Sequence, residues 1–101
     1  MAAGIDTVAV ARVDAGASPV WFNRQGFSGT IPTRTGTGLY TLTMSAGGVD
    51  ATKGQYFGSL EGSGHISVRP TSDTDLAVVI TDATGVAADI DFNVLVTRIF
   101  F

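Results

Sequence analysis

The sequence predicts an all-β domain, a sandwich or jelly roll of about eight short antiparallel strands. Several stretches place apolar residues at every second position, which is the period of a strand. Turn sequences rich in glycine separate these stretches at regular intervals. No segment carries an amphipathic helical stripe longer than two turns. These three observations together exclude a helical body.

The first half of the chain predicts four strands separated by turn residues. Tyr40, Leu42 and Met44 share one face of the clearest of these strands, and threonines occupy the other face. Pro32 cannot donate a hydrogen bond to a neighbouring strand, so its segment either ends there or lies at a sheet edge. The four strands are expected at residues 5–13, 20–23, 27–31 and 38–44.

The second half predicts four more strands. Gly58 interrupts the first of them, which indicates a bulge or a close backbone approach. The third is a continuous apolar run rich in β-branched residues, so we expect it to be covered on both faces. Residues 82–85 carry hairpin-type turn residues. The four strands are expected at residues 55–60, 65–69, 76–81 and 90–101.

The last strand organises the rest of the chain. Apolar residues recur at every second position, at Ile90, Phe92, Val94 and Val96. If these residues fill the sandwich, the opposite face presents Leu95, Ile99 and Phe101. A lone chain would leave those three side chains in water, and an exposed apolar patch favours association.

The composition also indicates association. Charged residues make up 15 % of the chain, against about 25 % in an ordinary globular domain. Hydrophobic residues make up 45 %, and the mean hydropathy is +0.31. The chain therefore has few groups to face water, and we expect part of its surface to be buried against copies of itself or another protein.

Several classes of function are disfavoured by charge and composition. The net charge is −3, and the six basic residues are scattered singly, so no basic stripe exists for a nucleic-acid backbone. The longest apolar run, residues 76–80, is too short to span a membrane. The absence of cysteine excludes disulfides and thiolate metal sites.

Catalytic and cofactor motifs are also missing. His65 is the single histidine, and there is no nucleophile elbow or acid–base pair, so we expect no enzyme activity and assign no catalytic residue. Gly36 and Gly38 lack the lysine and helix of a phosphate-binding loop. The aspartates at 73 and 75, and at 89 and 91, could contribute to a calcium site, but aspartate also favours loops and strand starts. We assign no metal or cofactor.

Two stretches carry a resemblance to a known group of proteins. Residues 34–44 (RTGTGLYTLTM) and 89–98 (DIDFNVLVTR) resemble, in order and separation, the small jelly-roll domains of tailed-phage virion proteins. Those domains have a tumour necrosis factor-like topology and assemble as trimers. They occur at tail-fibre tips and as capsid decoration, or cement, proteins. The resemblance implies a jelly-roll domain with the C-terminal strand in the inner sheet of a homotrimer.

The resemblance also implies a function and a location. A small free-standing domain fits a decoration protein better than a fibre tip, which would end a longer chain. We therefore expect a trimer on the outer surface of a phage capsid, bound to the major capsid protein and stabilising the expanded shell. Residues 1–7 would be a docking arm and residues 8–101 the jelly-roll domain. The expected capsid contacts are Ala2, Ala3, Gly4 and Ile5.

The expected trimer interface combines the end of the last strand with one aromatic residue. Alternation sends Trp21 and Phe22 to opposite faces, so one ring belongs to the core and the other to an interface. Aromatic residues are enriched in interface cores. The interface candidates are Leu95, Ile99, Phe101 and Trp21.

An alternative function is a receptor-binding head of a phage tail fibre or head fibre, which would recognise a host glycan or protein. Aromatic faces stack on sugars, so Tyr56 and His65, together with Trp21, are the candidate ligand contacts. Binding to a glycan array would distinguish this alternative from a decoration protein.

Overall fold

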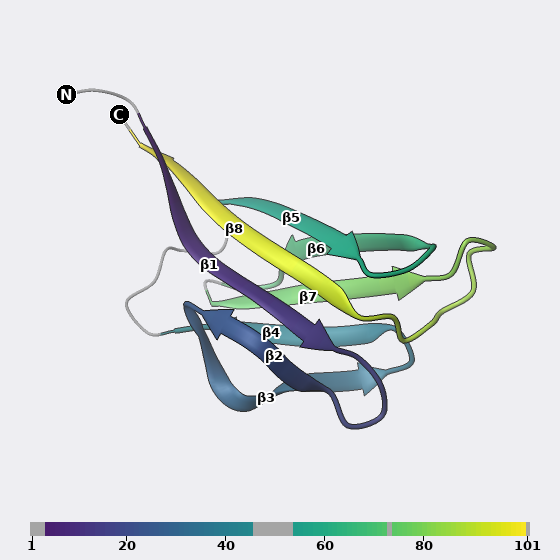
Figure 1. Cartoon of the computed structure of the whole chain (residues 1–101). Coiled ribbons are helices and arrows are strands. Elements are labelled where there is room, and N and C mark those ends of the chain that lie inside the picture. The colour runs from purple at the N-terminus through teal and green to yellow at the C-terminus, as the bar shows by residue number, and fades with distance from the viewer. Residues whose placement is uncertain (1–3, 46–53, 73, 101) are drawn as a thin grey trace.

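The computed structural model describes residues 4–45, 54–72 and 74–100, and for residues 4–8, 30 and 98–100 it describes the backbone alone. Eight strands follow one another, and no helix occurs within these ranges (Figure 1). The strands are β1 (Gly4–Asp14), β2 (Val20–Gln25), β3 (Phe27–Gly36), β4 (Leu39–Met44), β5 (Gln55–Leu60), β6 (His65–Pro70), β7 (Asp75–Thr81) and β8 (Phe92–Phe100).

The strands form two antiparallel sheets that face each other. The first sheet has the order β2-β1-β8-β5, and the second has the order β3-β4-β7-β6. The pairing is nested, because the first strand pairs with the last and β4 pairs with β7. Nested pairing across two packed sheets is the arrangement of a jelly roll. The predicted fold class, an all-β jelly-roll sandwich of eight strands, is confirmed.

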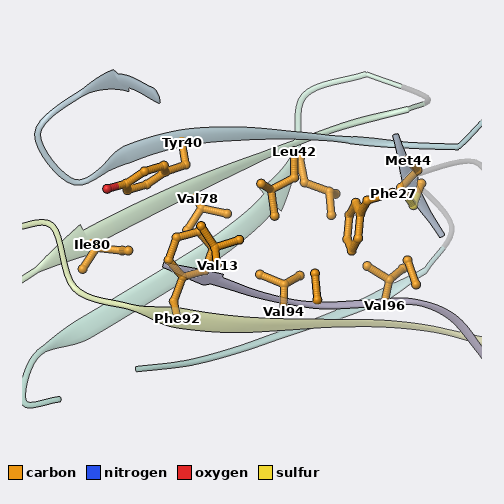
Figure 2. Packing of buried hydrophobic residues seen from close by; sticks show 13 residues of the cluster. Val13, Phe27, Tyr40, Leu42, Met44, Val78, Ile80, Phe92, Val94 and Val96 are labelled. Carbon is orange, nitrogen blue, oxygen red and sulfur yellow. The ribbon is translucent and has the colours of Figure 1, made fainter. Parts of the chain in front are cut away.

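One core lies between the sheets, and the predicted alternation fills it (Figure 2). The rings of Tyr40 and Phe92 meet across the sandwich with their centroids 5.1 Å apart, which is within the range of favourable aromatic pairs. The buried side chains from β4 are Tyr40, Leu42 and Met44, and those from β8 are Phe92, Val94 and Val96.

The strand β7 differs from the expectation that both of its faces are covered. Leu76, Val78 and Ile80 are buried, but Val79 on the other face is 39 % exposed. Val79 pairs with Leu39 of β4, which is also exposed. The prediction was wrong because β-branched residues favour strands whether or not a second layer covers them. No described element packs on this outer face of the second sheet.

Pro32 lies at a sheet edge, one of the two positions its chemistry allows. It belongs to β3, the outermost strand of the second sheet. The pairing of β3 with β4 shifts register between Ser28 and Thr33, so the missing N–H falls in an interrupted part of the ladder. The segment continues as a strand to Gly36.

Gly58 lies where β6 packs closely on β5, and the strand has no bulge there. β5 pairs with β8 without a register shift around this glycine. A Cβ atom at position 58 would lie 2.9 Å from side-chain atoms of Ile66 and of Val68. The glycine therefore lets β6 pack closely on β5 and close this edge of the sandwich.

The segment before the last strand also differs from expectation. Residues 82–85 form a tight turn in which the Asp82 carboxylate accepts hydrogen bonds from the backbone N–H groups of Thr84 and Val86. The turn closes a short antiparallel pairing, in which Thr81 bridges Ala87 and the Asp82 N–H donates to the Val86 carbonyl. The chain then crosses to the other sheet, because β7 and β8 belong to different sheets. The strand itself starts at Phe92, two residues after Ile90.

The start of β1 and the end of β8 lie side by side (Figure 1). Gly4 of β1 pairs with Phe100 of β8, and Ile5 pairs with Ile99. β2 joins β1 only from Val10 onward. The described part of the predicted arm is therefore the start of β1, and it forms a two-stranded ribbon with the end of β8.

Candidate functional site: an apolar surface on the first sheet

A row of apolar side chains crosses the outer face of the first sheet. Val10 of β1 is the pairing partner of Leu95 of β8, which in turn pairs with Phe57 of β5. Paired residues on neighbouring strands project from the same face, so the three side chains are neighbours. Val10 is 39 % exposed and Phe57 54 % exposed, while Leu95 is half-buried between them. We call Val10, Leu95 and Phe57 the apolar row.

A shallow groove of about 260 Å³ runs along the apolar row. Its lining is predominantly apolar. The residues that line it are Val10, Phe57, Gly58, Ser59, Asn93, Val94 and Leu95. Small-molecule sites commonly measure about 300–1,000 Å³ and hold convergent polar groups. This groove is smaller, and its chemistry suits an apolar side chain.

Phe22 is the second apolar feature of this face. It lies on the edge strand β2, opposite a register shift of β1 between Arg12 and Val13, and is 62 % exposed. The guanidinium of Arg12 lies over its ring, 4.8 Å from the centroid. Such a cation–π contact favours one orientation of the ring. The sheet therefore presents a protruding aromatic ring at its β2 edge and a groove near its β5 edge.

Polar residues border the groove on one side. Asn93 donates through Nδ2 to Ser59 Oγ at 3.3 Å and to Glu61 Oε1 at 2.8 Å. Arg12 Nη1 is 3.8 Å from Glu61 Oε1. An apolar centre with a polar margin is the usual anatomy of a protein–protein interface.

The residues predicted for the trimer interface do not all lie on the same part of the molecule. Leu95 faces outward, as alternation predicted, and lines the groove. Trp21 is half-buried and stacks on Phe27, with ring centroids 5.6 Å apart, and its Nε1 donates to the Gly29 carbonyl. Trp21 therefore closes the edge of the core, and Phe22 is the ring that the outer face presents. Of the remaining candidates, only the backbone of Ile99 is described, and Phe101 lies outside the described residues.

Two of the four capsid-docking candidates fall at the start of β1. Gly4 and Ile5 belong to the terminal ribbon, where their backbones pair with β8. Ala2 and Ala3 lie outside the described residues.

The candidate ligand contacts do not converge. Tyr56 is half-buried against the core, and its hydroxyl accepts a hydrogen bond from the Gly54 N–H. His65 is exposed at the start of β6, where it pairs with Thr81. Tyr56 lies near the start of β5, away from the β5–β6 connection, and His65 directly follows that connection. Trp21 lies on the edge strand at the far side of the first sheet. The three side chains do not form one platform.

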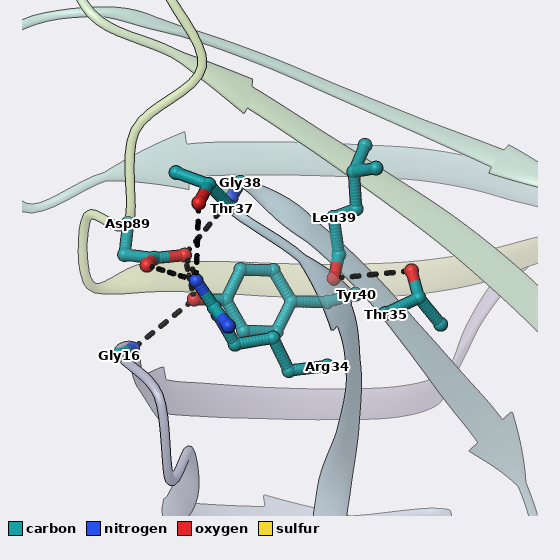
Figure 3. Close-up of polar contacts among 8 residues, drawn as sticks. All are labelled: Gly16, Arg34, Thr35, Thr37, Gly38, Leu39, Tyr40 and Asp89. Carbon is teal, nitrogen blue, oxygen red and sulfur yellow. Dashed lines mark hydrogen bonds and ion pairs between the residues drawn. The ribbon is translucent and has the colours of Figure 1, made fainter.

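A polar cluster centred on Asp89 joins three connections at one end of the sandwich (Figure 3). Asp89 accepts hydrogen bonds from Arg34 Nη2 at 2.8 Å, from the Gly38 N–H at 2.9 Å and from the Tyr40 hydroxyl at 2.6 Å. The Tyr40 hydroxyl accepts a further bond from the Gly16 N–H at 3.1 Å. These polar groups bond to one another across three connections, so the role of the cluster is to hold the connections together.

The electrostatics of the cluster follow from these contacts. The Arg34 hydrogen bonds, helped by the donors Tyr40 and Gly38, lower the pKa of Asp89 from 3.8 to about 2. Burial, together with the hydrogen bond to Asp89, raises the pKa of Tyr40. The carboxylate is thus ionised and the phenol neutral over the whole neutral range.

The sequence pattern singles out Asp89 only as one half of a possible calcium pair with Asp91. The carboxylate instead meets protein donors, as does that of Asp91, whose Oδ1 accepts the Ala15 N–H at 2.8 Å. Asp75 Oδ1 accepts from the Thr43 hydroxyl at 2.8 Å, and residue 73 is not described. Across residues 4–45, 54–72 and 74–100, no three acidic or histidine side chains gather as metal ligands would. No local signal links Asp89 to Arg34, which is 55 positions away.

Comparisons with protein-family models, with curated proteins and with solved structures found no match for this chain.

Proposed function

We propose that this chain is a virion structural protein of a tailed phage, a decoration protein that binds the outer capsid surface as a homotrimer and stabilises the expanded shell. The apolar row and groove on the outer face of the first sheet are the observation that carries this proposal. The sheet has β8 as a central strand. The resemblance to phage jelly-roll domains implies an inner trimer sheet of that kind.

The energetics of the apolar row support self-association. Removing a large apolar side chain from water contributes about 1.5–3 kcal/mol. Val10, Phe57 and Phe22 are all substantially exposed in the single chain, so their burial gives a favourable term in each subunit. A chain with 15 % charged residues has little polar surface to offset such a patch.

A decoration protein acts by binding one state of its partner. Binding the expanded shell and not the unexpanded one would stabilise the expanded shell by mass action. The terminal ribbon would supply the contact, because strand edges can pair with a strand of another chain. In the ribbon, β1 already uses one edge to pair with β8. Its other edge, before Val10, has no partner strand among the described residues.

Charge on the apolar row should prevent self-association. The variants Leu95→Asp and Phe57→Asp should each convert the trimer to a monomer, a threefold loss of mass measured by light scattering, because burying an unpaired charge is costly. Phe57 is largely exposed in the single chain, so its variant should retain the fold, as circular dichroism would check. Val79→Asp on the second sheet is the matched control and should leave the mass unchanged. A Phe57→Asp trimer would argue against this interface.

Removing the start of the chain should weaken capsid binding. A variant that lacks residues 1–5 loses the pairing of Gly4 and Ile5 with β8 and should show lower occupancy on expanded capsids of the source phage in a sedimentation assay. Its oligomeric mass should stay that of the full chain. Unchanged occupancy would remove the arm from the docking mechanism.

The receptor-binding alternative has its own test. The candidate contacts Tyr56, His65 and Trp21 lie apart, which favours a structural role over a glycan reader. A glycan array probed with the purified protein should therefore show no specific sugar binding. Specific binding would support the receptor head instead.

A further inference from the structure

The groove along the apolar row is an apolar hollow, and the Phe22 ring is an apolar protrusion of the kind that fits such a hollow. The groove is lined by apolar atoms and holds about 260 Å³, and the ring is an apolar protrusion that is 62 % exposed. Aromatic side chains that fill pockets are the usual anchors of protein interfaces. The ring that fills the groove must come either from the same chain or from another copy of it.

A single chain cannot place its own Phe22 in its own groove. Phe22 lies on β2, and Phe57 at the groove lies on β5, with β1 and β8 between the two strands. Neighbouring strands are about 4.8 Å apart, so the two positions are separated by at least about 14 Å across the sheet. Only the ring of a second copy can therefore lie against Phe57 in the groove.

The ring and the groove lie at different places on the same sheet face, so a contact between copies joins two different patches. Contacts between two different patches are head-to-tail, and they close into a ring when the rotation allows it. Resting on the trimer of the proposed function, we propose that Phe22 of one copy inserts between Val10, Leu95 and Phe57 of the next copy. Each of the three subunits then donates one ring and accepts one ring.

Arg12 prepares Phe22 for this contact. Its guanidinium lies 4.8 Å from the ring centroid, a contact that favours one orientation of the exposed ring before association. A side chain that is already ordered loses less entropy when it binds. The polar residues Asn93 and Glu61 border the groove and can remain hydrated at the margin.

Engineered cysteines can test the head-to-tail contact, since the natural chain has none. Asn23 adjoins Phe22, and Ser59 lines the groove; both are exposed, and neither is the ring itself or a member of the apolar row. In one chain, Asn23 and Ser59 are connected through the paired residues Arg12 and Asn93, three strand spacings or about 14 Å apart. Disulfide formation needs Cα atoms within about 7 Å, so a disulfide between these positions must join two copies.

The double variant Asn23→Cys/Ser59→Cys should form covalent trimers after mild oxidation, seen on a non-reducing gel. An equimolar mixture of the two single variants should give covalent dimers that contain one of each. Each single variant alone should stay uncrosslinked. As a matched control, Asn23→Cys/Ser67→Cys should give no crosslink, because Ser67 is exposed on β6 of the second sheet.

A further variant measures how much the Phe22 ring contributes to the stability of the trimer. Phe22→Ala should raise the concentration at which half of the trimer dissociates by at least about 30-fold, the effect of losing an aromatic anchor. Unchanged dissociation would overturn the inference. Crosslinks formed by Asn23→Cys alone would also overturn it, since they indicate a like-to-like contact.

The outcomes separate this inference from the proposed function. A wild-type trimer by mass whose double variant forms no disulfide would overturn the contact and leave the trimer standing. A wild-type monomer at all concentrations would overturn both.

Discussion

Replacing Gly38 with alanine should lower the free energy of unfolding by about 4 kcal/mol, a large part of the stability of a small domain. Gly38 has a φ of +68°, and a Cβ atom there would lie 2.3 Å from the Ile80 carbonyl oxygen and 2.9 Å from that of Ala88. Both are backbone atoms that cannot move aside cheaply. Urea unfolding followed by circular dichroism, at one protein concentration, measures the change.

Gly85 provides the matched control for that substitution. It also has a positive φ, of +90°, but a Cβ atom there would meet nothing within 4 Å. Gly85→Ala should therefore cost only the backbone strain, about 1–2 kcal/mol. Equal losses for the two variants would show that the close approach at Gly38 is not real.

The second large effect concerns the carboxylate that Gly38 contacts. Asp89→Asn should destabilise the fold by about 2–3 kcal/mol at pH 7, because hydrogen bonds to a charged group are lost. The bonds affected are those from Arg34, Gly38 and Tyr40. The same urea unfolding measurement applies. A loss below about 0.5 kcal/mol, the level of an ordinary surface change, would contradict the role of the cluster.

The pH dependence of this effect has a fixed sign. The folded-state pKa of Asp89 is lowered from 3.8 to about 2, so the unfolded chain binds the proton more tightly. The stabilisation is present above the unfolded pKa and is lost as the pH falls from about 4 toward 2. The stability difference between the wild type and Asp89→Asn should therefore shrink over that interval.

Tyr40→Phe tests whether the cluster acts as a unit. The variant removes the hydroxyl that donates to Asp89 and accepts from Gly16. Groups in one hydrogen-bond network have coupled effects, so the losses from Tyr40→Phe and Asp89→Asn should not add. Strict additivity in the double variant would mean that the two groups act independently.

Alternation along the chain was enough to predict parts of the candidate surface. It placed Leu95 outside and Val94 and Val96 inside, and all three placements are confirmed. It could not choose between Trp21 and Phe22, because both rings suit a core. The choice depends on Phe27, which stacks on Trp21 from the opposite sheet.

The sequence pattern did not reveal Val10 and Phe57 as members of the apolar row, because strand pairing decides which residues become neighbours. Val10 and Phe57 lie in strands whose local patterns do not show which strand stands beside them. Their meeting on either side of Leu95 depends on the register of β1 and β5 against β8. An exposed phenylalanine beside Gly58 was the signal available, but it has no meaning until the pairing is known.

The sequence by itself determined that this protein is an eight-stranded all-β sandwich and which face of its clearest strands is buried, because hydrophobic period and turn chemistry are local properties. The tertiary structure alone decided that the first strand pairs with the last, that Asp89 meets Arg34 and that three strands share one apolar row. Those contacts join residues far apart in the chain, and strand order and register bring them together.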